Sequence, residues 1–492
     1  MLPLDIHSLW RGRGKIRGGV HPESHKEATA DQPIVTAFPL PNRLYLPLQQ
    51  HLGQPAEPVV RVGDKVLKGQ LLAASQGPIS APVHASTSGT IAEITEYPAP
   101  HPSGLPTPTL VLEPDGEDRW MESAGIDDPF SLTPEDICAR VDKAGIVGMG
   151  GAAFPSAMKL NLGWKTRIRM LIINGGECEP YLTCDDRLMR ERALEIIEGV
   201  RIMLHGLQCP TALIAIEDNK PEAYAAMAEA ARKHGRIEVV LVPSLYPMGW
   251  EKNLVTHLTG REIPAGGRPT DVGVLLHNVA TAYAVQQAIR YGRPLISRVV
   301  TVSGEAVERP RNVEAPLGTL LSELLAFCGH RSERTARYVM GGPMMGDQLP
   351  HVLVPVVKRT SGILALTPEE LHAADTRPCI RCGRCVSACP VGLLPLEMMT
   401  RIRAGQFDAA VGFGLRDCIN CSSCSYVCPS RIPLVQYFKY ASGELAARRE
   451  AQQKTEQTNR LAEEKQRRLE RVKQEAAQRR AQAQSSAQGT TP

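Results

Sequence analysis

Two runs of cysteines constrain this chain more than any other feature. They read CIRCGRCVSACP over residues 379–390 and CINCSSCSYVCP over residues 418–429. In each run, three cysteines at intervals of three residues can wrap a loop around one cubane cluster. The fourth cysteine, which is followed by proline, is carried away on the next helix and reaches the other cluster. We therefore predict two [4Fe-4S] clusters, one bound by a first cysteine set, Cys379, Cys382, Cys385 and Cys428, and one bound by a second cysteine set, Cys389, Cys418, Cys421 and Cys424.

Zinc is the competing interpretation of such runs. Zinc sites use four ligands in two pairs, and they require neither a third evenly spaced cysteine nor the trailing proline. Two clusters with every ligand position filled leave no open iron for a substrate, so the runs predict a relay of single electrons. The other five cysteines lack ligand spacing and are expected to be buried thiols: Cys138, Cys178, Cys184, Cys209 and Cys328.

Length and charge exclude several classes of protein. The 492 residues predict about three to five domains. There is no run of 18 apolar residues, so no transmembrane helix is expected, and the N-terminus lacks the apolar core of a secretory signal. The net charge of +4 is accounted for by residues 441–492, with eleven Lys or Arg and seven Glu. A neutral body argues against nucleic-acid binding, and we expect a cytoplasmic location.

A glycine-rich stretch, GIVGMGGAAFPSAMK, covers residues 145–159. It contains GxGxxA, but a Rossmann fingerprint must directly follow a strand. Residues 133–144 instead predict a capped helix with proline in its first turn and glycine after its end. The stretch can still bring backbone N–H groups close to a phosphate, with Lys159 as a point charge. A purely structural turn is the alternative.

A strand is expected over residues 166–174, ending in the polar loop NGGECEPYLTCDDR. Ligands of α/β proteins bind in the crevice outside the carboxyl ends of strands. Two glutamates and an asparagine in this loop can bind the hydroxyl groups of a ribityl or ribose unit. A solvated loop without a ligand is the alternative.

The glycine-rich stretch, the polar loop, YPMGWEKNL over residues 246–254 and the two cysteine runs occur in this order. The combination resembles the RnfC/RsxC family of the Rnf/Rsx ion-translocating electron transport complex over residues 10–440. Its centre is similar to the NADH- and FMN-binding subunit of respiratory complex I. That resemblance implies cofactor-binding roles for two groups: a phosphate and NADH pocket of Gly148, Gly150, Gly151, Ala152, Phe154 and Lys159, with Asn278 and Thr281 beside the phosphate, and a flavin and nicotinamide side of Asn174, Glu177 and Glu179. The chain departs from the complex I pattern at Gly176, His277 and Trp250.

The resemblance and the punctuation of the chain predict a multidomain α/β fold. Residues 40–94 are similar to a biotinyl/lipoyl barrel-sandwich, but the hairpin that carries the modified lysine is missing. Residues 297–350 suit a β-grasp module of the soluble-ligand-binding type. The expected division is an N-terminal segment (1–39), a barrel-sandwich hybrid (40–125), a Rossmann-like FMN/NADH domain (130–290), a β-grasp module (291–366), an α-helical two-[4Fe-4S] ferredoxin-type domain (367–440) and a charged tail, helical or disordered (441–492).

The expected function is that of an electron-input subunit of an ion-translocating oxidoreductase, without a catalytic residue of its own. NADH would pass electrons through FMN and the two clusters to other subunits of a complex at the inner membrane. The chain would be attached peripherally on the cytoplasmic side, with ferredoxin as a further candidate partner. The alternative is an iron–sulfur adaptor that does not itself oxidise NADH. For the tail, a solvated helix is the expectation, and a basic surface for anionic lipid or a partner is the alternative.

Overall fold

In the computed structural model, the structure describes residues 14, 16–371 and 375–488. The chain divides into two compact units. The first comprises Met1–Gly392 and Cys421–Ile432, and the second comprises Leu393–Asn420 and Pro433–Pro492. No helix among the described residues is both long and apolar enough to cross a bilayer.

The centre of the first unit is a parallel four-stranded sheet in the order β10-β9-β8-β11. Its strands are β8 (Met170–Gly175), β9 (Ala212–Glu217), β10 (Ile237–Val242) and β11 (Val274–Asn278). The chain moves outward from β8 through β9 to β10 and then returns to the other side of β8 with β11. The strand order therefore reverses between β8 and β11, which is where a crevice opens in folds of this kind.

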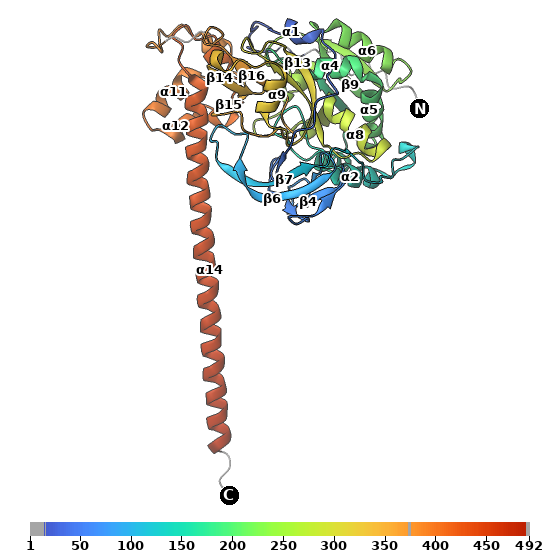
Figure 1. Ribbon diagram of the computed structural model, residues 1–492. Helices are drawn as coiled ribbons and strands as arrows, with labels where there is room; N and C mark the ends of the chain where they lie inside the picture. The colour runs from blue at the N-terminus through green and yellow to red at the C-terminus, as the bar shows by residue number, and fades with distance from the viewer. Residues whose placement is uncertain (1–13, 15, 372–374, 489–492) are drawn as a thin grey trace, which may run out of the picture. The chain divides into compact units, whose positions relative to one another are not determined.

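Apolar residues on both faces of the sheet explain its helical layers. Along β8, Leu171 and Ile173 belong to one core cluster, while Met170 and Ile172 belong to another. Alternation with a period of two sends these pairs to opposite faces. Figure 1 shows α5 and α8 packed on each other beside the sheet. The helices are α2 (Pro134–Lys143), α3 (Ser156–Lys165), α4 (Cys184–Glu191), α5 (Ala193–Leu207), α6 (Pro221–Ala231), α7 (Glu251–Thr259) and α8 (Val279–Tyr291).

The helix expected before the glycine-rich stretch is present as α2. Thr133 caps it by accepting a hydrogen bond from the backbone N–H of Asp136, whose carboxylate accepts one from the N–H of Thr133. Pro134 occupies the first turn, where a missing N–H group has no cost. The stretch therefore follows a helix and precedes β8, so the rejection of an ordinary Rossmann fingerprint is confirmed.

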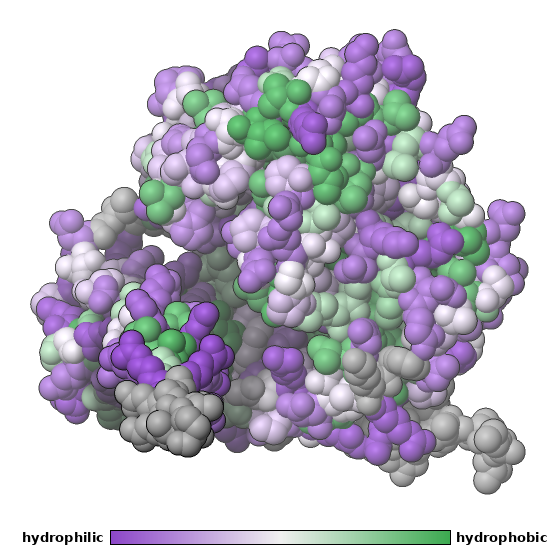
Figure 2. All heavy atoms as spheres, turned by 90° about the horizontal axis from the view of Figure 1, so that it is seen from below, coloured by the Kyte–Doolittle hydropathy of each residue, from purple (hydrophilic) through white to green (hydrophobic). Residues whose placement is uncertain are grey.

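The barrel-sandwich consists of two small sheets, β1-β7-β6-β3 and β2-β4-β5. Figure 2 views the molecule from the side on which β4, β6 and β7 lie in Figure 1, and it shows an apolar area among polar side chains. Large apolar side chains such as Val59 and Val62 are more than half exposed in this module. Its strands are β1 (Leu44–Pro47), β2 (Glu57–Pro58), β3 (Lys65–Val66), β4 (Leu71–Ala74), β5 (Val83–His84), β6 (Gly89–Pro98) and β7 (Pro106–Pro114).

The β-grasp module is a mixed five-stranded sheet in the order β13-β12-β16-β14-β15. It does not form a core separate from the barrel-sandwich, because Leu44 and Leu112 of that module share one apolar cluster with Val302 and Leu324. Small modules bury too little surface alone, and a joint core overcomes this limit. Its elements are β12 (Ser297–Ser303), β13 (Arg311–Pro316), α9 (Leu321–Phe327), β14 (Arg337–Met340), β15 (Asp347–Leu349) and β16 (Gly362–Leu366). A short helix α1 (Glu27–Ala30) precedes β1.

The cysteine runs contribute two short helices to the first unit, α10 (Arg384–Ser387) and α13 (Ser423–Tyr426), which pack on each other. In the second unit, α11 (Pro395–Arg403) packs on α12 (Phe407–Gly412) and on α14 (Leu434–Gln488). The tail is helical, as one of its two expected forms, and α14 begins at Leu434 rather than near residue 441. Beyond Leu445 its described side chains are mostly polar and exposed, and ion pairs one turn apart support it, such as Lys454–Glu450 and Arg460–Glu464.

Lys358 joins three modules of the first unit. Its fully buried ammonium group donates hydrogen bonds to the carbonyl oxygens of Pro82 and Gly145, both at 2.7 Å. Pro82 belongs to the barrel-sandwich, Gly145 to the flavin-type domain and Lys358 to the β-grasp module. Burial lowers the pKa of Lys358 to about 7, although the nearby Asp142 opposes this shift. The charged lysine is therefore costly to keep inside, and its two carbonyl partners offset part of that cost.

This burial predicts a pH-dependent contribution to stability. The folded-state pKa of about 7 lies below the value of about 10.4 in an unfolded chain. Between these values the unfolded chain binds more protons, so stability rises with pH in this window. His84 and His51 next to Lys358 stay neutral there, since their pKa values are lowered to about 3 and about 4 by burial and by Lys358.

Relative to a Lys358→Met variant, the unmodified protein should therefore gain roughly 1 kcal/mol of unfolding free energy per pH unit above pH 7. Thermal unfolding of both proteins between pH 6 and pH 9.5 measures this. The gap between their midpoints should stay constant below pH 7 and change steadily in favour of the unmodified protein above it. A gap that is constant throughout would contradict the assignment.

Candidate functional site

The reversal of strand order places two asparagines side by side at the carboxyl edge of the sheet. Asn174 ends β8, Asn278 ends β11, and the two residues are in register. The amide of Asn278 lies 3.5 Å from the carbonyl oxygen of Asn174. The Asn174 side chain accepts a hydrogen bond from the N–H of Gly176 and donates one to the carbonyl of Gly249. Both asparagines predicted to bind cofactor thus line one crevice.

The glycine-rich loop closes over this crevice. The N–H of Gly148 donates to the carbonyl of Phe154, so the loop folds back on itself, and the N–H of Met149 donates to the hydroxyl of Thr281 on α8. A Cβ atom on Gly150 would lie 3.1 Å from the side chain of Asn278, whereas one on Gly151 would meet no atom within 4 Å. Glycine at residue 150 permits the close approach, and residue 151 borders open space. Ala152 is exposed and Phe154 half-buried.

The N-terminus of α8 points into the same region. Asn278 caps this helix by accepting a hydrogen bond from the N–H of Ala280 at 2.8 Å, and it donates to the Asp185 carboxylate at 2.6 Å. The cap therefore has a fixed orientation. A helix N-terminus carries unsatisfied N–H groups and a partial positive charge, so it favours a phosphate nearby.

Lys159 and His277 add two buried basic groups. Lys159, on α3, reaches the carbonyl oxygen of Leu276 at 3.4 Å. Burial lowers its pKa, and Glu251 in the first turn of α7 acts in the opposite direction. His277 is fully buried, and burial together with Lys159 holds its pKa well below the usual range, so the ring is neutral. Within the part of the chain that the structure describes, neither ring nitrogen has a hydrogen-bond partner.

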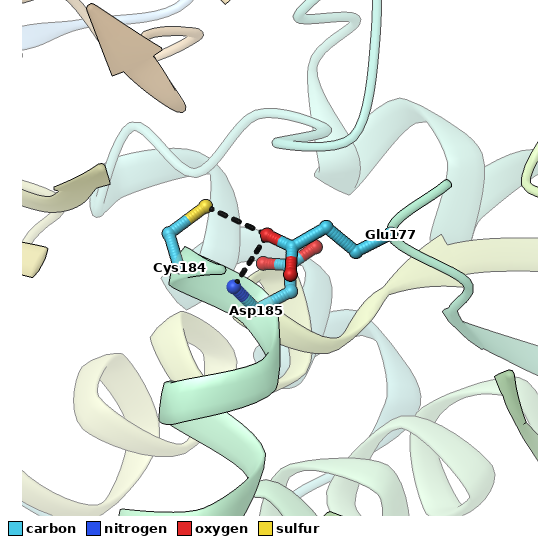
Figure 3. A group of neighbouring side chains, drawn as sticks. All are labelled: Glu177, Cys184 and Asp185. Atoms are coloured by element: carbon cyan, nitrogen blue, oxygen red, sulfur yellow. Dashed lines mark hydrogen bonds between the residues drawn. The ribbon is translucent and has the colours of Figure 1, made fainter. Parts of the chain in front are cut away.

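The Glu177 carboxylate is already occupied by groups of the protein. It accepts hydrogen bonds from the thiol of Cys184 at 3.2 Å and from the N–H groups of Asp185 and Asp186 at 2.9 and 3.3 Å (Figure 3). It thereby caps α4. Burial, with Glu177 next to it, raises the pKa of Asp185 to about 6. Glu177 reaches the crevice only indirectly, through Asp185 and its hydrogen bond to Asn278.

Glu179 has a similar architectural contact. Its carboxylate accepts hydrogen bonds from the N–H groups of Met344 and Met345 in the β-grasp loop, at 3.0 and 2.8 Å. Burial raises the pKa of Glu179 to about 7, and these two N–H groups oppose the shift. The side chain therefore fixes the β-grasp loop to the polar loop after β8.

Tyr246 connects this region to the second cysteine run. It is almost fully buried, and its hydroxyl donates a hydrogen bond to the carbonyl oxygen of Cys421 at 2.8 Å. The Glu179 carboxylate lies 3.5 Å from the same hydroxyl. The backbone of Tyr246 also exchanges two hydrogen bonds with Val20. Sequence reasoning quoted Tyr246 within a motif but gave it no role, because nothing near it in the sequence indicates a partner 175 residues away.

The structure brings members of the first cysteine set together. Burial raises the pKa of the Cys385 thiol, and the neighbouring Cys428 and Cys379 act in the same direction. Cys428 comes from the second run, so the crossing between runs expected for its fourth cysteine is present in the structure. Cys382 lies in the same loop as Cys379 and is exposed like it.

The second cysteine set shows the reciprocal crossing. Burial raises the pKa of Cys421, and Cys389 of the first run is close enough to add to the shift, while Ser423 opposes it. Cys424 is buried on α13. Cys418 follows a short 3₁₀ turn, η5 (Leu415–Asp417), in the second unit. Three of the five remaining cysteines are buried and two are half-buried, without a place in either set.

The spacing of ligand atoms distinguishes clusters from zinc. A tetrahedral zinc ion holds its cysteine sulfurs about 3.8 Å apart, given zinc–sulfur bonds of about 2.3 Å. Among the described residues, three or more His, Cys, Asp or Glu ligand atoms gather within 4.8 Å only at Glu177, Cys184 and Asp185. The eight cysteines of the two runs therefore lack zinc spacing, and their wider grouping suits cubes of four irons. The residues of the crevice likewise fit a phosphate-bearing cofactor: a loop edge bordering open space at Gly151, a helix N-terminus and an unpartnered buried imidazole.

Comparison with known families assigns each module. A Nuo51 FMN-binding domain model matches residues 141–287, and an RnfC barrel sandwich hybrid domain model matches residues 14–117. An SLBB domain model matches residues 299–348, and a 4Fe-4S dicluster domain model matches residues 378–432. The expected α/β multidomain fold and the expected FMN and iron–sulfur cofactors are therefore confirmed.

Whole-length relatives agree. The RnfC-type component of the ion-translocating oxidoreductase complex of Rhodobacter capsulatus is 51% identical over 434 residues, which cover 88% of this chain and 83% of the relative. Those of Serratia proteamaculans and Pseudomonas aeruginosa are both 45% identical, over 87% and 92% of this chain and 61% and 58% of the relatives. A NAD⁺-reducing [NiFe]-hydrogenase structure aligns with 19% identity over 60% of each chain, and its TM-score of 0.45 is too low to establish a shared overall fold. With its FMN-binding and 4Fe-4S dicluster domains, the chain belongs to the RnfC family of ion-translocating oxidoreductase complexes.

Proposed function

We propose that this subunit is where electrons enter the complex, from NADH through FMN held in the crevice between β8 and β11 and onward through two [4Fe-4S] clusters. When bound, FMN exchanges electron pairs with nicotinamide and single electrons with iron–sulfur clusters, which gives a chemical reason for the two domains to share a chain. The supporting observation is the hydrogen bond from Tyr246 to the Cys421 carbonyl, because it connects the crevice domain directly to a cysteine run.

The crevice residues would bind and orient, and none of them needs to transfer a proton. Backbone N–H groups of Gly148, Gly150 and Gly151, together with the N-terminus of α8, would hold the phosphate, with Lys159 supplying charge. Asn278 is kept in orientation by Asp185, and Thr281 fixes the loop to α8 through the N–H of Met149. Asn174, which lies next to Asn278 in the sheet, would face the ring side of the cofactor.

The cysteines would serve as cluster ligands in crossed sets, as their neighbourhoods indicate. The first cysteine set takes its fourth ligand, Cys428, from the second run, and the second cysteine set takes Cys389 from the first run. The proximity of Cys385 to Cys428 and of Cys421 to Cys389 supports both crossings.

Other subunits of the complex would accept the electrons and couple their flow to ion movement. The family is named for ion translocation, and ion movement requires partner chains in a membrane. We therefore propose peripheral attachment at the cytoplasmic face of the inner membrane, through protein partners.

A second function, an iron–sulfur adaptor that does not oxidise NADH, is favoured by one observation. The carboxylates of Glu177 and Glu179 are both occupied by backbone N–H groups, and Gly176 between them and Asn174 has no side chain. The nicotinamide side of the crevice consequently offers few unoccupied polar groups. Direct reduction by NADH separates the two functions.

The proposal predicts that the purified chain, prepared anaerobically, contains about eight irons and one FMN. Addition of NADH should bleach both the flavin absorption and the broad iron–sulfur absorption, because the two cofactors are in electronic contact. An absorption spectrum with iron, sulfide and flavin analysis measures this. Eight irons without a response to NADH would support the adaptor and refute the electron-input role.

The crossed ligand sets predict an unusual pattern of iron loss. The double variant Cys389→Ala/Cys424→Ala should keep about four of the eight irons, because both residues bind the same cluster. The matched double variant Cys424→Ala/Cys428→Ala should lose nearly all iron, because its residues bind different clusters. Iron analysis after anaerobic reconstitution decides between the patterns. The opposite result, with more iron in the second variant, would mean that each run binds its own cluster.

A further inference from the structure

The two cysteine sets differ in their surroundings within the first unit. Cys421 and Cys424 are buried, and the carbonyl of Cys421 accepts the Tyr246 hydroxyl. The backbone of the N-terminal segment lies against the neighbouring Ala388, whose carbonyl accepts the N–H of Gly19 at 3.0 Å. A Cβ atom on Gly18 would lie 2.5 Å from the carbonyl oxygen of Cys389. The second cysteine set is thus held on its inner side by the flavin-type domain and the N-terminal segment.

The first cysteine set lies toward solvent. Cys379 and Cys382 are exposed, and Cys385 and Cys428 are half-buried. The exposure of both sets is that of the polypeptide alone, so the comparison between them is like for like. An electron that arrives from the crevice would therefore reach the Cys421 side first and leave from the Cys379 side.

Large apolar side chains surround the exposed cysteines. Ile380 is 69% exposed, Tyr426 50% and Val386 36%. Val386 lies on α10 and Tyr426 on α13, which pack together, and Ile380 lies between Cys379 and Cys382 in the chain. Single exposed apolar residues are ordinary, but a group around a redox centre marks a place where a partner can exclude water.

Arginines border this apolar group. Arg377, Arg381 and Arg384 are exposed, and none of them forms an ion pair within the described part of the chain. Arg431 is exposed beside them in the sequence of the second run, and Asp375 is the one acidic residue in the described stretches 375–392 and 421–432. We call Ile380, Val386, Tyr426, Arg377, Arg381 and Arg384 the cluster collar.

We propose that the cluster collar docks a one-electron carrier protein whose own redox group is bordered by carboxylates, and that the first cysteine set is the point from which electrons leave this chain. This inference rests on the proposed function for the origin of the electrons, and not for the docking itself. One electron would pass from the reduced cluster to the oxidised carrier, with no bond made or broken and no proton transferred. Transient redox interfaces are small, below about 1,200 Å², so a collar of this size is sufficient.

Complementary charge on such an interface speeds and orients encounter and weakens with salt. The competing role for the arginines is to offset the negative charge of the bound cluster. That role would change the reduction potential of the cluster on loss of the arginines and would leave the affinity for a carrier unchanged. The two roles are therefore separable by measuring binding and potential on the same variants.

The test uses the full chain with both clusters, reduced with dithionite so that NADH is not involved. Acidic flavodoxin is the probe carrier and a basic c-type cytochrome is the opposite-charge control. Calorimetry on oxidised proteins in 20 mM salt should show binding of flavodoxin that weakens at least tenfold in 200 mM salt. Arg381→Gln/Arg384→Gln should weaken it at least fivefold, with iron content unchanged, and electron transfer to flavodoxin should slow in parallel.

Two further variants control for folding and for overall charge. Arg381→Lys/Arg384→Lys keeps the charge and should restore binding, and Arg61→Gln/Lys65→Gln removes equal charge from the barrel-sandwich and should have no effect. Equal weakening by both Gln pairs, preference for the basic cytochrome, or a shifted cluster potential with unchanged affinity would each overturn the proposal. A chain that binds flavodoxin in this way but ignores NADH would refute the electron-input role alone.

Discussion

The hydrogen bond between the Tyr246 hydroxyl and the Cys421 carbonyl is the contact on which the electron route depends. Around it, the Glu179 carboxylate binds two N–H groups of the β-grasp loop, and the backbone of Tyr246 pairs with Val20. A buried polar group left without a partner costs about 1–3 kcal/mol, so these groups stabilise the fold only in one mutual arrangement. That requirement gives the crevice and the cysteine run a fixed separation, which electron transfer needs.

The chemistry of the crevice follows from which polar groups remain available. Glu177 caps α4 and Glu179 holds a loop, so both carboxylates act mainly on the architecture. The unoccupied groups are backbone N–H groups of the glycine loop, a helix N-terminus and the neutral imidazole of His277. These are donors without a strong base among them. Such a site can bind and orient an anionic cofactor, and it leaves the redox chemistry to the cofactor.

Local signals in the sequence were sufficient for several parts of the structure. The cysteine runs predicted their crossed neighbourhoods, the cap at Thr133 predicted α2, and the apolar run before Asn174 predicted β8. Contacts between distant residues were not predictable in this way. The bond from Glu179 to Met344 spans 165 residues, and the shared core of the barrel-sandwich and β-grasp modules joins segments that each read as a separate domain. Tyr246 was overlooked for the same reason, since its partner is set by tertiary packing.

The central claim is an order of cofactors: crevice, then the Cys421 side, then the Cys379 side. An anaerobically determined structure of the chain with FMN and both clusters bound tests it most directly. The account predicts that the cluster bound by Cys421 is the nearer of the two to the flavin ring, with the Tyr246 hydroxyl still bonded to the Cys421 carbonyl. A flavin ring closer to the cluster bound by Cys379 would contradict it.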